Sequence, residues 1–178
     1  MIEQKYLDLL RELSTDESSH SGRTLLEHLA KTHDLLEKWE NPKDVCVGGL
    51  FHSIYGTEYY KIESADLSDR KRIAAVIGAR AEDLAFLFCT TDRTGFFKEA
   101  DKRGPVLIDR KTEMTVRVSV ATLAALMEIE VANYIEQFNP VTAPPNLVDY
   151  MRYMLKAGSD HLTTKAKEEL AYVLKQFD

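Results

Sequence analysis

The sequence contains few of the residues that interrupt or cross-link a chain. Its 178 residues include 8 glycines, 5 prolines and 2 cysteines. Cys46 and Cys89 lie inside apolar stretches and do not make a disulfide framework. A chain of this length buries enough surface to fold without one, and long stretches free of glycine and proline favour helices. We therefore predict a reduced, cytoplasmic, helical protein.

Long apolar runs and an excess of positive charge are also missing. No run approaches the roughly 18 apolar residues of a membrane span, and the charged residues 1–13 predict no signal peptide. Aspartate and glutamate number 29 against 23 lysines and arginines, which gives a net charge of −6. An acidic surface repels a phosphate backbone, so we expect neither nucleic acid nor a membrane as the main partner.

The apolar pattern predicts helices along most of the chain. Its period and its breaks place them at about residues 2–13, 22–39, 42–54, 69–77, 81–89, 112–138, 147–156 and 164–177. Residues 90–111 have the composition of an irregular segment, and no period-2 stretch predicts a strand. The predicted class is all-α, a helical bundle in a single domain of residues 1–178 with a closing helical pair at 146–177.

Among the 5 histidines, His28 and His52 form the informative pair. His28 lies on the apolar arc of the 22–39 helix, and His52 directly follows the apolar segment VCVGGLF. Two inward imidazoles on consecutive helices can meet and share a metal ion, since neutral imidazole is the commonest metal ligand in proteins. The alternative is that each is a buried histidine bonded to a backbone carbonyl.

The stretches TLLEHLAKTHDLL and DVCVGGLFHSIYGTE resemble the opening of an HD-domain metalloprotein, in which a histidine on one helix precedes a His-Asp pair on the next. RIAAVIGARAEDLAFLFCTTD is similar to the segment that follows this pair in RelA/SpoT-type alarmone hydrolases. The resemblance covers about residues 20–138. It implies an HD-domain-like helical bundle and a metal-dependent phosphohydrolase acting on a nucleotide or another phosphate ester.

The resemblance also implies roles for particular residues. His28 and His52 correspond to metal-binding histidines. Glu130, or else Glu128 in the same segment LMEIEVAN, is the expected carboxylate ligand. The implied cofactor is a divalent metal ion (manganese, iron, zinc or nickel), either mononuclear or absent. The candidate catalytic residues are Ser53, Tyr55 and Glu128.

Two departures from the family pattern bear on activity. Ser53 stands where the family has the metal-binding aspartate, and a hydroxyl is a far poorer ligand than a carboxylate. Tyr55-Gly56-Thr57 stands where the alarmone hydrolases carry a Glu-Asp pair for the hydrolytic water. One alternative is an enzyme of different chemistry on the same scaffold. The other is a catalytically degenerate HD-like protein that binds a small ligand or a protein partner.

Four residues are candidates for binding an anionic small-molecule substrate. His20 and Arg23 lie at the start of the 22–39 helix, where backbone N–H groups favour anions. Tyr59 follows His52 closely enough to stack on a base, and Arg93 could bind phosphate. The competing interpretation is an exposed histidine, a surface arginine, a loop-covering tyrosine and a structural aspartate–arginine pair.

Overall fold

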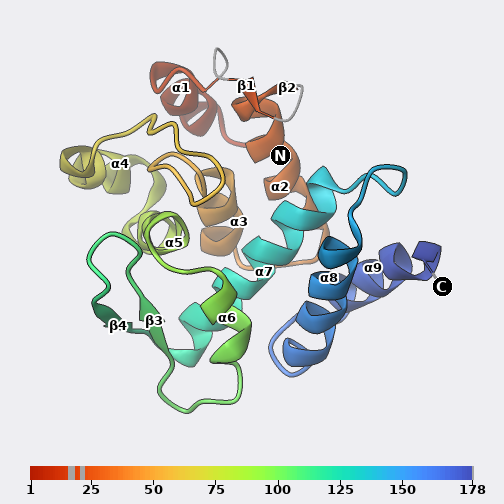
Figure 1. Cartoon of the computed structure of the whole chain (residues 1–178). Helices are drawn as coiled ribbons and strands as arrows, with labels where there is room; N and C mark the ends of the chain where they lie inside the picture. The colour runs from red at the N-terminus through yellow and green to blue at the C-terminus, as the bar shows by residue number, and fades with distance from the viewer. Residues whose placement is uncertain (16–18, 21–22, 178) are drawn as a thin grey trace. The chain divides into compact units, whose positions relative to one another are not determined.

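The computed structural model describes residues 1–15, 19–20 and 23–177, the side chains of residues 19, 20 and 23 excepted. The chain divides into two compact units, Met1–Thr91 and Asp92–Asp178, and the single domain over residues 1–178 stays a prediction. Helices make up most of each unit (Figure 1), which confirms the predicted all-α class. No helix in the described part of the chain is long and apolar enough to cross a membrane.

The helices of the first unit follow the predicted ranges closely. A short antiparallel pair, β1 (Ser19–His20) and β2 (Arg23–Thr24), precedes the second helix. That helix begins at a capping box, in which the Thr24 hydroxyl accepts the Glu27 N–H and the Glu27 carboxylate accepts the Thr24 N–H. The helices are α1 Gln4–Glu12, α2 Leu25–Lys38, α3 Lys43–Leu50, the 3-10 helix η1 Leu67–Asp69, α4 Arg70–Ile77 and α5 Ala79–Thr90.

Helix α3 packs against both α2 and α5, and two glycines permit its close approach to them. A Cβ atom on Gly49 would lie 2.3 Å from Leu36 Cδ1 on α2, and one on Gly48 would lie 3.0 Å from Leu84 Cβ on α5. Helical neighbours on both sides explain why α3 is apolar around its circumference. Its end is therefore a buried place, and His52 follows directly after it.

The second unit differs from the sequence-based expectation in its first half. It contains α6 Thr94–Lys98, β3 Val106–Ile108, β4 Thr115–Arg117, α7 Val120–Gln137, α8 Pro145–Ala157, α9 Thr164–Leu174 and the 3-10 helix η2 Lys175–Phe177. The expectation of no strand is wrong here, because β3 and β4 form an antiparallel hairpin. Asp109 stabilises its turn by accepting the N–H groups of Lys111 and Thr112.

The longest helix begins later than predicted. Ser119 caps α7 by accepting the N–H of Thr122, and the β-branched residues before it belong to β4. Helices α8 and α9 pack together, and α7 contacts α9. The Glu128 carboxylate on α7 accepts the N–H of Thr163, the N-cap residue of α9. The predicted closing helical pair is therefore tied to α7 within the second unit.

Candidate functional site

His28 and His52 meet inside the first unit. His28 lies on α2, His52 follows the end of α3, and both residues are buried. Their Nε2 atoms are 3.2 Å apart, and the rings make an edge-to-face contact with centroids 5.0 Å apart. The two imidazoles that the sequence places on inward faces therefore do converge.

The hydrogen bonds of His52 determine where its proton lies. Its Nδ1 is 2.6 Å from the backbone oxygen of Gly49, and because a carbonyl oxygen can only accept, Nδ1 must carry the hydrogen. In the neutral ring the lone pair is then on Nε2, the atom that faces His28. This lone pair accepts either an N–H of His28 or a cation.

A shared metal ion fits this arrangement. Two imidazole nitrogens that each lie about 2.1 Å from one ion are roughly 3.0–3.4 Å apart when the bond angle is about 90–109°. The observed separation of 3.2 Å between the Nε2 atoms of His28 and His52 falls within that range. An Nδ1–H bonded to a backbone carbonyl is also the usual support of a metal-binding histidine, since it orients the ring. The pair thus supplies two nitrogen atoms at a separation that one ion can bridge.

Helix α5 holds His52 in place from a second side. The ring of Phe88 makes an edge-to-face contact with His52, with centroids 5.0 Å apart. The thiol of Cys89 donates a hydrogen bond to the His52 carbonyl oxygen at 3.0 Å. Cys46 and Cys89 are both free and buried, in agreement with the absence of a disulfide expected from the sequence. The imidazole of His52 is therefore fixed by both packing and hydrogen bonds.

Ser53 and Tyr55 are two of the candidate catalytic residues. They follow His52 closely in the sequence, and both are buried. The Tyr55 hydroxyl donates to Glu82 Oε1 at 2.9 Å. Arg70 binds the same carboxylate with two N–H groups, at 2.7 and 2.8 Å, and lies 3.6 Å from the centroid of the Phe86 ring. Tyr55 is thus held by a network that links the segment after α3 to α4 and α5.

The electrostatics of this network keep its donors protonated. Burial, followed by the hydrogen bond to Glu82, raises the pKa of Tyr55 well above its ordinary value of 10.0. The hydrogen bonds that Arg70 donates to Glu82 raise the pKa of Arg70 as well. Both groups therefore donate to the carboxylate over the whole physiological pH range. This anchors the backbone that carries Ser53, the residue between His52 and the Tyr55 turn.

The sequence-based interpretation missed Glu82 and Arg70. Each lies among other charged residues in a stretch that reads as a solvated helix face. The one available signal was Glu82 itself, which stands at the start of the apolar run LAFLF of α5 and is only 4% exposed in the structure. A buried carboxylate requires a partner, and that requirement alone could have pointed to Arg70.

The second unit brings together two further candidates, Arg93 and Glu130. Both are buried, and Arg93 Nη1 lies 3.1 Å from Glu130 Oε2. Glu128, also buried, accepts the N–H of Thr163. Glu130 as a metal ligand, Glu128 as a catalytic residue and Arg93 as a phosphate ligand stay predictions. Within their own unit, these side chains already have protein partners.

The remaining substrate-binding candidates are a tyrosine and two residues near β1 and β2. Tyr59 is 70% exposed, so its ring is accessible to a ligand. The backbones of His20 and Arg23 pair with each other across the two short strands. Their side chains lie outside the described residues, and their proposed contact with an anion stays a prediction.

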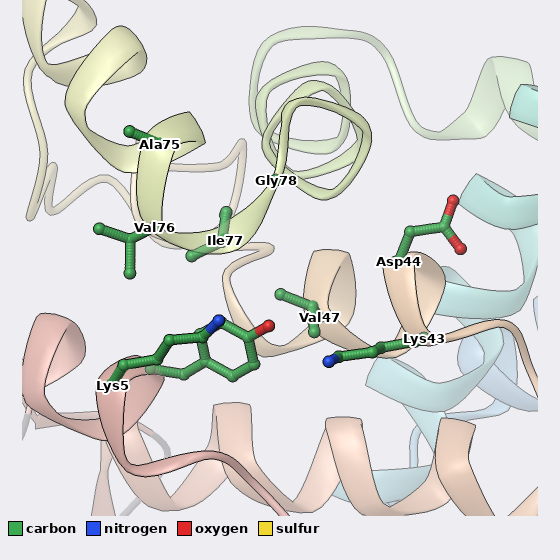
Figure 2. Close-up of a pocket in the computed structure, with 9 residues that line it drawn as sticks. Lys5, Lys43, Asp44, Val47, Ala75, Val76, Ile77 and Gly78 are labelled. Atoms are coloured by element: carbon green, nitrogen blue, oxygen red, sulfur yellow. The ribbon is translucent and has the colours of Figure 1, made fainter.

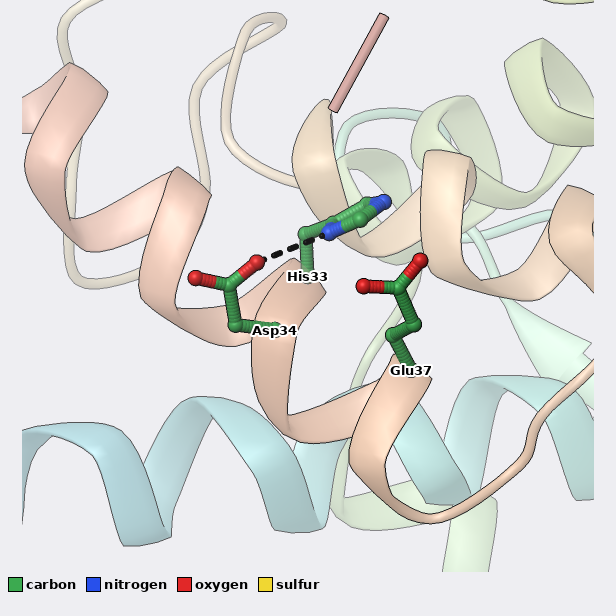
Figure 3. A group of neighbouring side chains, drawn as sticks. All are labelled: His33, Asp34 and Glu37. Atoms are coloured by element: carbon green, nitrogen blue, oxygen red, sulfur yellow. Dashed lines mark hydrogen bonds and ion pairs between the residues drawn. The ribbon is translucent and has the colours of Figure 1, made fainter. Parts of the chain in front are cut away.

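A second group of possible metal ligands lies on α2 (Figure 3). Ligand atoms of His33, Asp34 and Glu37 lie within 4.8 Å of one another. His33 Nδ1 is 3.2 Å from Asp34 Oδ1, and both carboxylate oxygens of Glu37 accept hydrogen bonds from the amino group of Met1 at 2.8 Å. Both carboxylates are exposed, and groups of exposed acidic side chains are common without a bound ion. This cluster serves best as a control for metal binding.

Comparisons with known proteins bear on the fold. A family model described as a domain of unknown function, DUF6817, matches residues 9–93, just under half of the 178-residue chain. A solved structure of a metazoan ortholog of SpoT, described as hydrolyzing ppGpp and as playing a role in starvation responses, aligns with a TM-score of 0.61. The alignment covers 99% of this chain and 97% of that chain at 9% identity. The chain has an HD-like helical fold.

The HD-like fold was predicted from the residues around His28 and His52, and the structural likeness confirms it. A search of curated protein sequences found no match. The fold places the histidine pair where a helix and the end of the next helix meet, as the resemblance to HD-domain proteins implies. Activity and substrate follow from the site rather than from the fold.

Proposed function

We propose that the protein is a metal-dependent phosphohydrolase that acts on a nucleotide or another phosphate ester, with His28 and His52 holding a divalent ion. The observation that carries this proposal is the 3.2 Å separation of two buried Nε2 atoms, one of which presents a lone pair. A bound ion would supply Lewis-acid activation of water and of a phosphoryl oxygen. A nucleotide is the favoured substrate class because the hydrolase of similar fold acts on ppGpp.

The chain's own residues contribute orientation and a dry environment. Gly49 holds the His52 ring through Nδ1, and Phe88 covers one side of that ring. The Tyr55–Glu82 bond fixes the turn after Ser53, a buried residue that directly follows His52 in the sequence. The proposal retains the sequence-based roles for Ser53, Tyr55 and Glu128 in catalysis, for Glu130 as a metal ligand, and for His20, Arg23, Tyr59 and Arg93 in substrate binding. The reduced cytoplasm is the proposed compartment.

One specific observation favours a second function. Ser53 stands at the position where HD-domain proteins have the ligand aspartate, and the nearby Tyr55 hydroxyl is engaged by Glu82. A site without its carboxylates can bind a ligand without hydrolysing it. The alternative is therefore an HD-like protein that binds a small molecule or a protein partner and has no catalytic activity.

Elemental analysis of protein purified without a chelator or a His-tag tests the proposal. We expect near-stoichiometric manganese, iron, zinc or nickel in the wild type, and its loss in His28→Gln and in His52→Gln. His33→Gln is the matched control, because it removes another buried histidine of α2, one that belongs to the cluster with Asp34 and Glu37. It should leave the metal content unchanged.

Hydrolysis assays then separate the two functions. Release of phosphate or pyrophosphate from ppGpp or from other nucleotides by metal-loaded protein, lost in the His52→Gln variant, supports the phosphohydrolase. Metal bound at His28 and His52 without turnover of any nucleotide supports the binding protein. A wild type that stays free of metal after incubation with each of the four ions refutes the metal site altogether.

A further inference from the structure

A cavity of about 560 Å³ lies at the other end of α3 from the histidine pair (Figure 2). It is formed by residues of α1, α3 and α4 and by Gly78, all in the first unit. Helix α3 has 8 residues, so Lys43 at its start and His52 beyond its end are separated by roughly 12 Å or more along the helix axis. The cavity is thus distinct from the candidate metal site.

The cavity has an apolar floor. Tyr6, Val47 and Ile77 line it and are 4%, 2% and 6% exposed, so their side chains belong to the packed core of the unit. Val76 adds a partly buried side chain at the wall. The cavity is open to solvent, so a ligand there contacts this apolar part of the lining on one side and keeps part of its own surface in water.

Two lysines supply positive charge at the mouth of the cavity. Lys5 on α1 and Lys43 on α3 both line it, and both bind the carboxylate of Glu3, at 3.2 and 2.5 Å. Asp44, the acidic residue of the lining, accepts the N–H of Val45 and lies 3.8 Å from Arg80. The carboxylate of Asp44 therefore interacts with its own helix and with Arg80. The two lysines pair with the carboxylate of Glu3 instead.

The carboxylate of Glu3 occupies the position between the two lysines. It is the N-cap residue of α1, yet its side chain makes no capping hydrogen bond to that helix and reaches Lys5 and Lys43 instead. The hydrogen bond to Lys43 lowers the pKa of Glu3, and the same bond raises the pKa of Lys43. The two ammonium groups are thus already arranged around one carboxylate beside an apolar cavity.

We propose that this cavity binds a small organic carboxylate with an apolar body, whose carboxylate replaces that of Glu3 between Lys5 and Lys43. The apolar body lies on the floor formed by Tyr6, Val47 and Ile77. Glu3 acts as an internal competitor that pairs with the two lysines when the ligand is absent. Because the Glu3 side chain is partly exposed and makes no capping hydrogen bond, it can move away while the Glu3 carbonyl continues to accept the N–H of Tyr6.

Calorimetric titration of the full chain with hexanoate tests this site, with acetate and hexanol as matched probes. Hexanoate should bind saturably. Acetate should bind about tenfold more weakly or worse, because it lacks four methylene groups. Hexanol should bind about fivefold more weakly or worse, because it lacks the charge that pairs with the two exposed lysines. An exposed ion pair competes only modestly, so Glu3→Gln should tighten hexanoate binding about two- to sixfold.

Variants of the lysines complete the test. Lys5→Met together with Lys43→Met should weaken hexanoate binding to the level of hexanol, whereas Lys31→Met, on an exposed position of α2, should leave it unchanged. Circular dichroism verifies that each variant is folded. Added chelator should have no effect, which separates this site from the proposed metal site. The idea fails if the Glu3→Gln variant shows no saturable binding, if hexanol binds as well as hexanoate, or if the lysine variant binds like the wild type.

Discussion

The buried carboxylate of Glu82 supports the segment next to the candidate site, and its removal should be costly. Glu82 is 4% exposed and receives three hydrogen bonds, two from Arg70 and one from Tyr55. In Glu82→Ala the Arg70 guanidinium and the buried Tyr55 hydroxyl lose their acceptor together. The Tyr55 hydroxyl, left buried without its acceptor, costs about 1–3 kcal/mol. Arg70 is 33% exposed and can be hydrated, so it adds less than the roughly 3–5 kcal/mol of a fully buried unpaired charge. We expect the free energy of unfolding to fall by about 3 kcal/mol.

Tyr55→Phe should be much milder, because Arg70 still satisfies the Glu82 carboxylate. The loss of one hydrogen bond to a charged acceptor corresponds to about 1.5–3 kcal/mol. In the Glu82→Ala background, the same change removes a hydroxyl that has no acceptor and should be neutral or stabilising. The double-mutant cycle should therefore show a coupling free energy of at least about 1 kcal/mol.

Trp39 provides the assay. It is the single tryptophan, is 1% exposed and belongs to the first unit, so its fluorescence during urea titration reports the unfolding of that unit. Glu58→Ala, an exposed glutamate of the same unit, is the control and should change the free energy of unfolding by less than about 0.5 kcal/mol. If Glu82→Ala behaves like this control, or if the cycle is additive, the network does not support the site.

Three further predictions concern stability. Tyr55 ionises near pH 10 in the unfolded chain, whereas its raised pKa keeps the phenol protonated in the folded protein. The free energy of unfolding should therefore decline as the pH rises above about 10. Melting curves at alkaline pH should show a smaller decline for Tyr55→Phe. Gly48→Ala should lower the free energy of unfolding in urea titrations by about 1–2 kcal/mol, because its Cβ would lie 3.0 Å from Leu84 Cβ on α5. Gly95→Ala is the control and should be neutral or stabilising, because the space around its Cβ is open. Arg93→Met should lower the free energy of unfolding by about 3–5 kcal/mol, because Glu130 would stay buried without its ion pair; Glu130→Gln in the same background should recover part of that loss.

Much of the fold could be predicted because local signals decide helices. The period of the apolar residues identified α2 and α3, and the Asn41-Pro42 boundary between them agrees with the structure. The all-round apolar character of α3 correctly indicated a buried helix, since α2 and α5 both pack against it. His28 and His52 could be paired for the same reason, because each lies on the buried side of an element whose period was clear.

Non-local pairing set the limit of these predictions. The strands of the β3–β4 hairpin have 3 residues each, too few for an alternating pattern to appear, and they are stabilised by pairing with each other. The β-branched residues before α7 directly precede a helical pattern but have a high propensity for strands. The N-cap at Ser119 begins the helix after them, and Thr115–Arg117 form β4. Arg70 and Glu82 are separated by 12 positions, so no local pattern joins them.

Ser53 is the residue at which a metal-binding histidine pair and a metal-free pair make opposite physical demands. It is 3% exposed and adjoins His52, so an aspartate there would bring a charge into a buried place. With a metal ion on His28 and His52, that charge gains a cation, and Ser53→Asp should bind manganese more tightly and melt at a higher temperature when manganese is added. Without an ion, the carboxylate is unpaired, and the variant should lose several kcal/mol of stability whether or not manganese or a chelator is present. Differential scanning fluorimetry of Ser53→Asp and Ser53→Asn with and without manganese distinguishes the cases, since the neutral asparagine has a similar size. A manganese-dependent rise in melting temperature that is confined to the aspartate variant identifies a site that has kept its two histidines for an ion. If each variant instead melts at the same temperature in manganese as in chelator, the histidine pair serves the packing of α2 against α3.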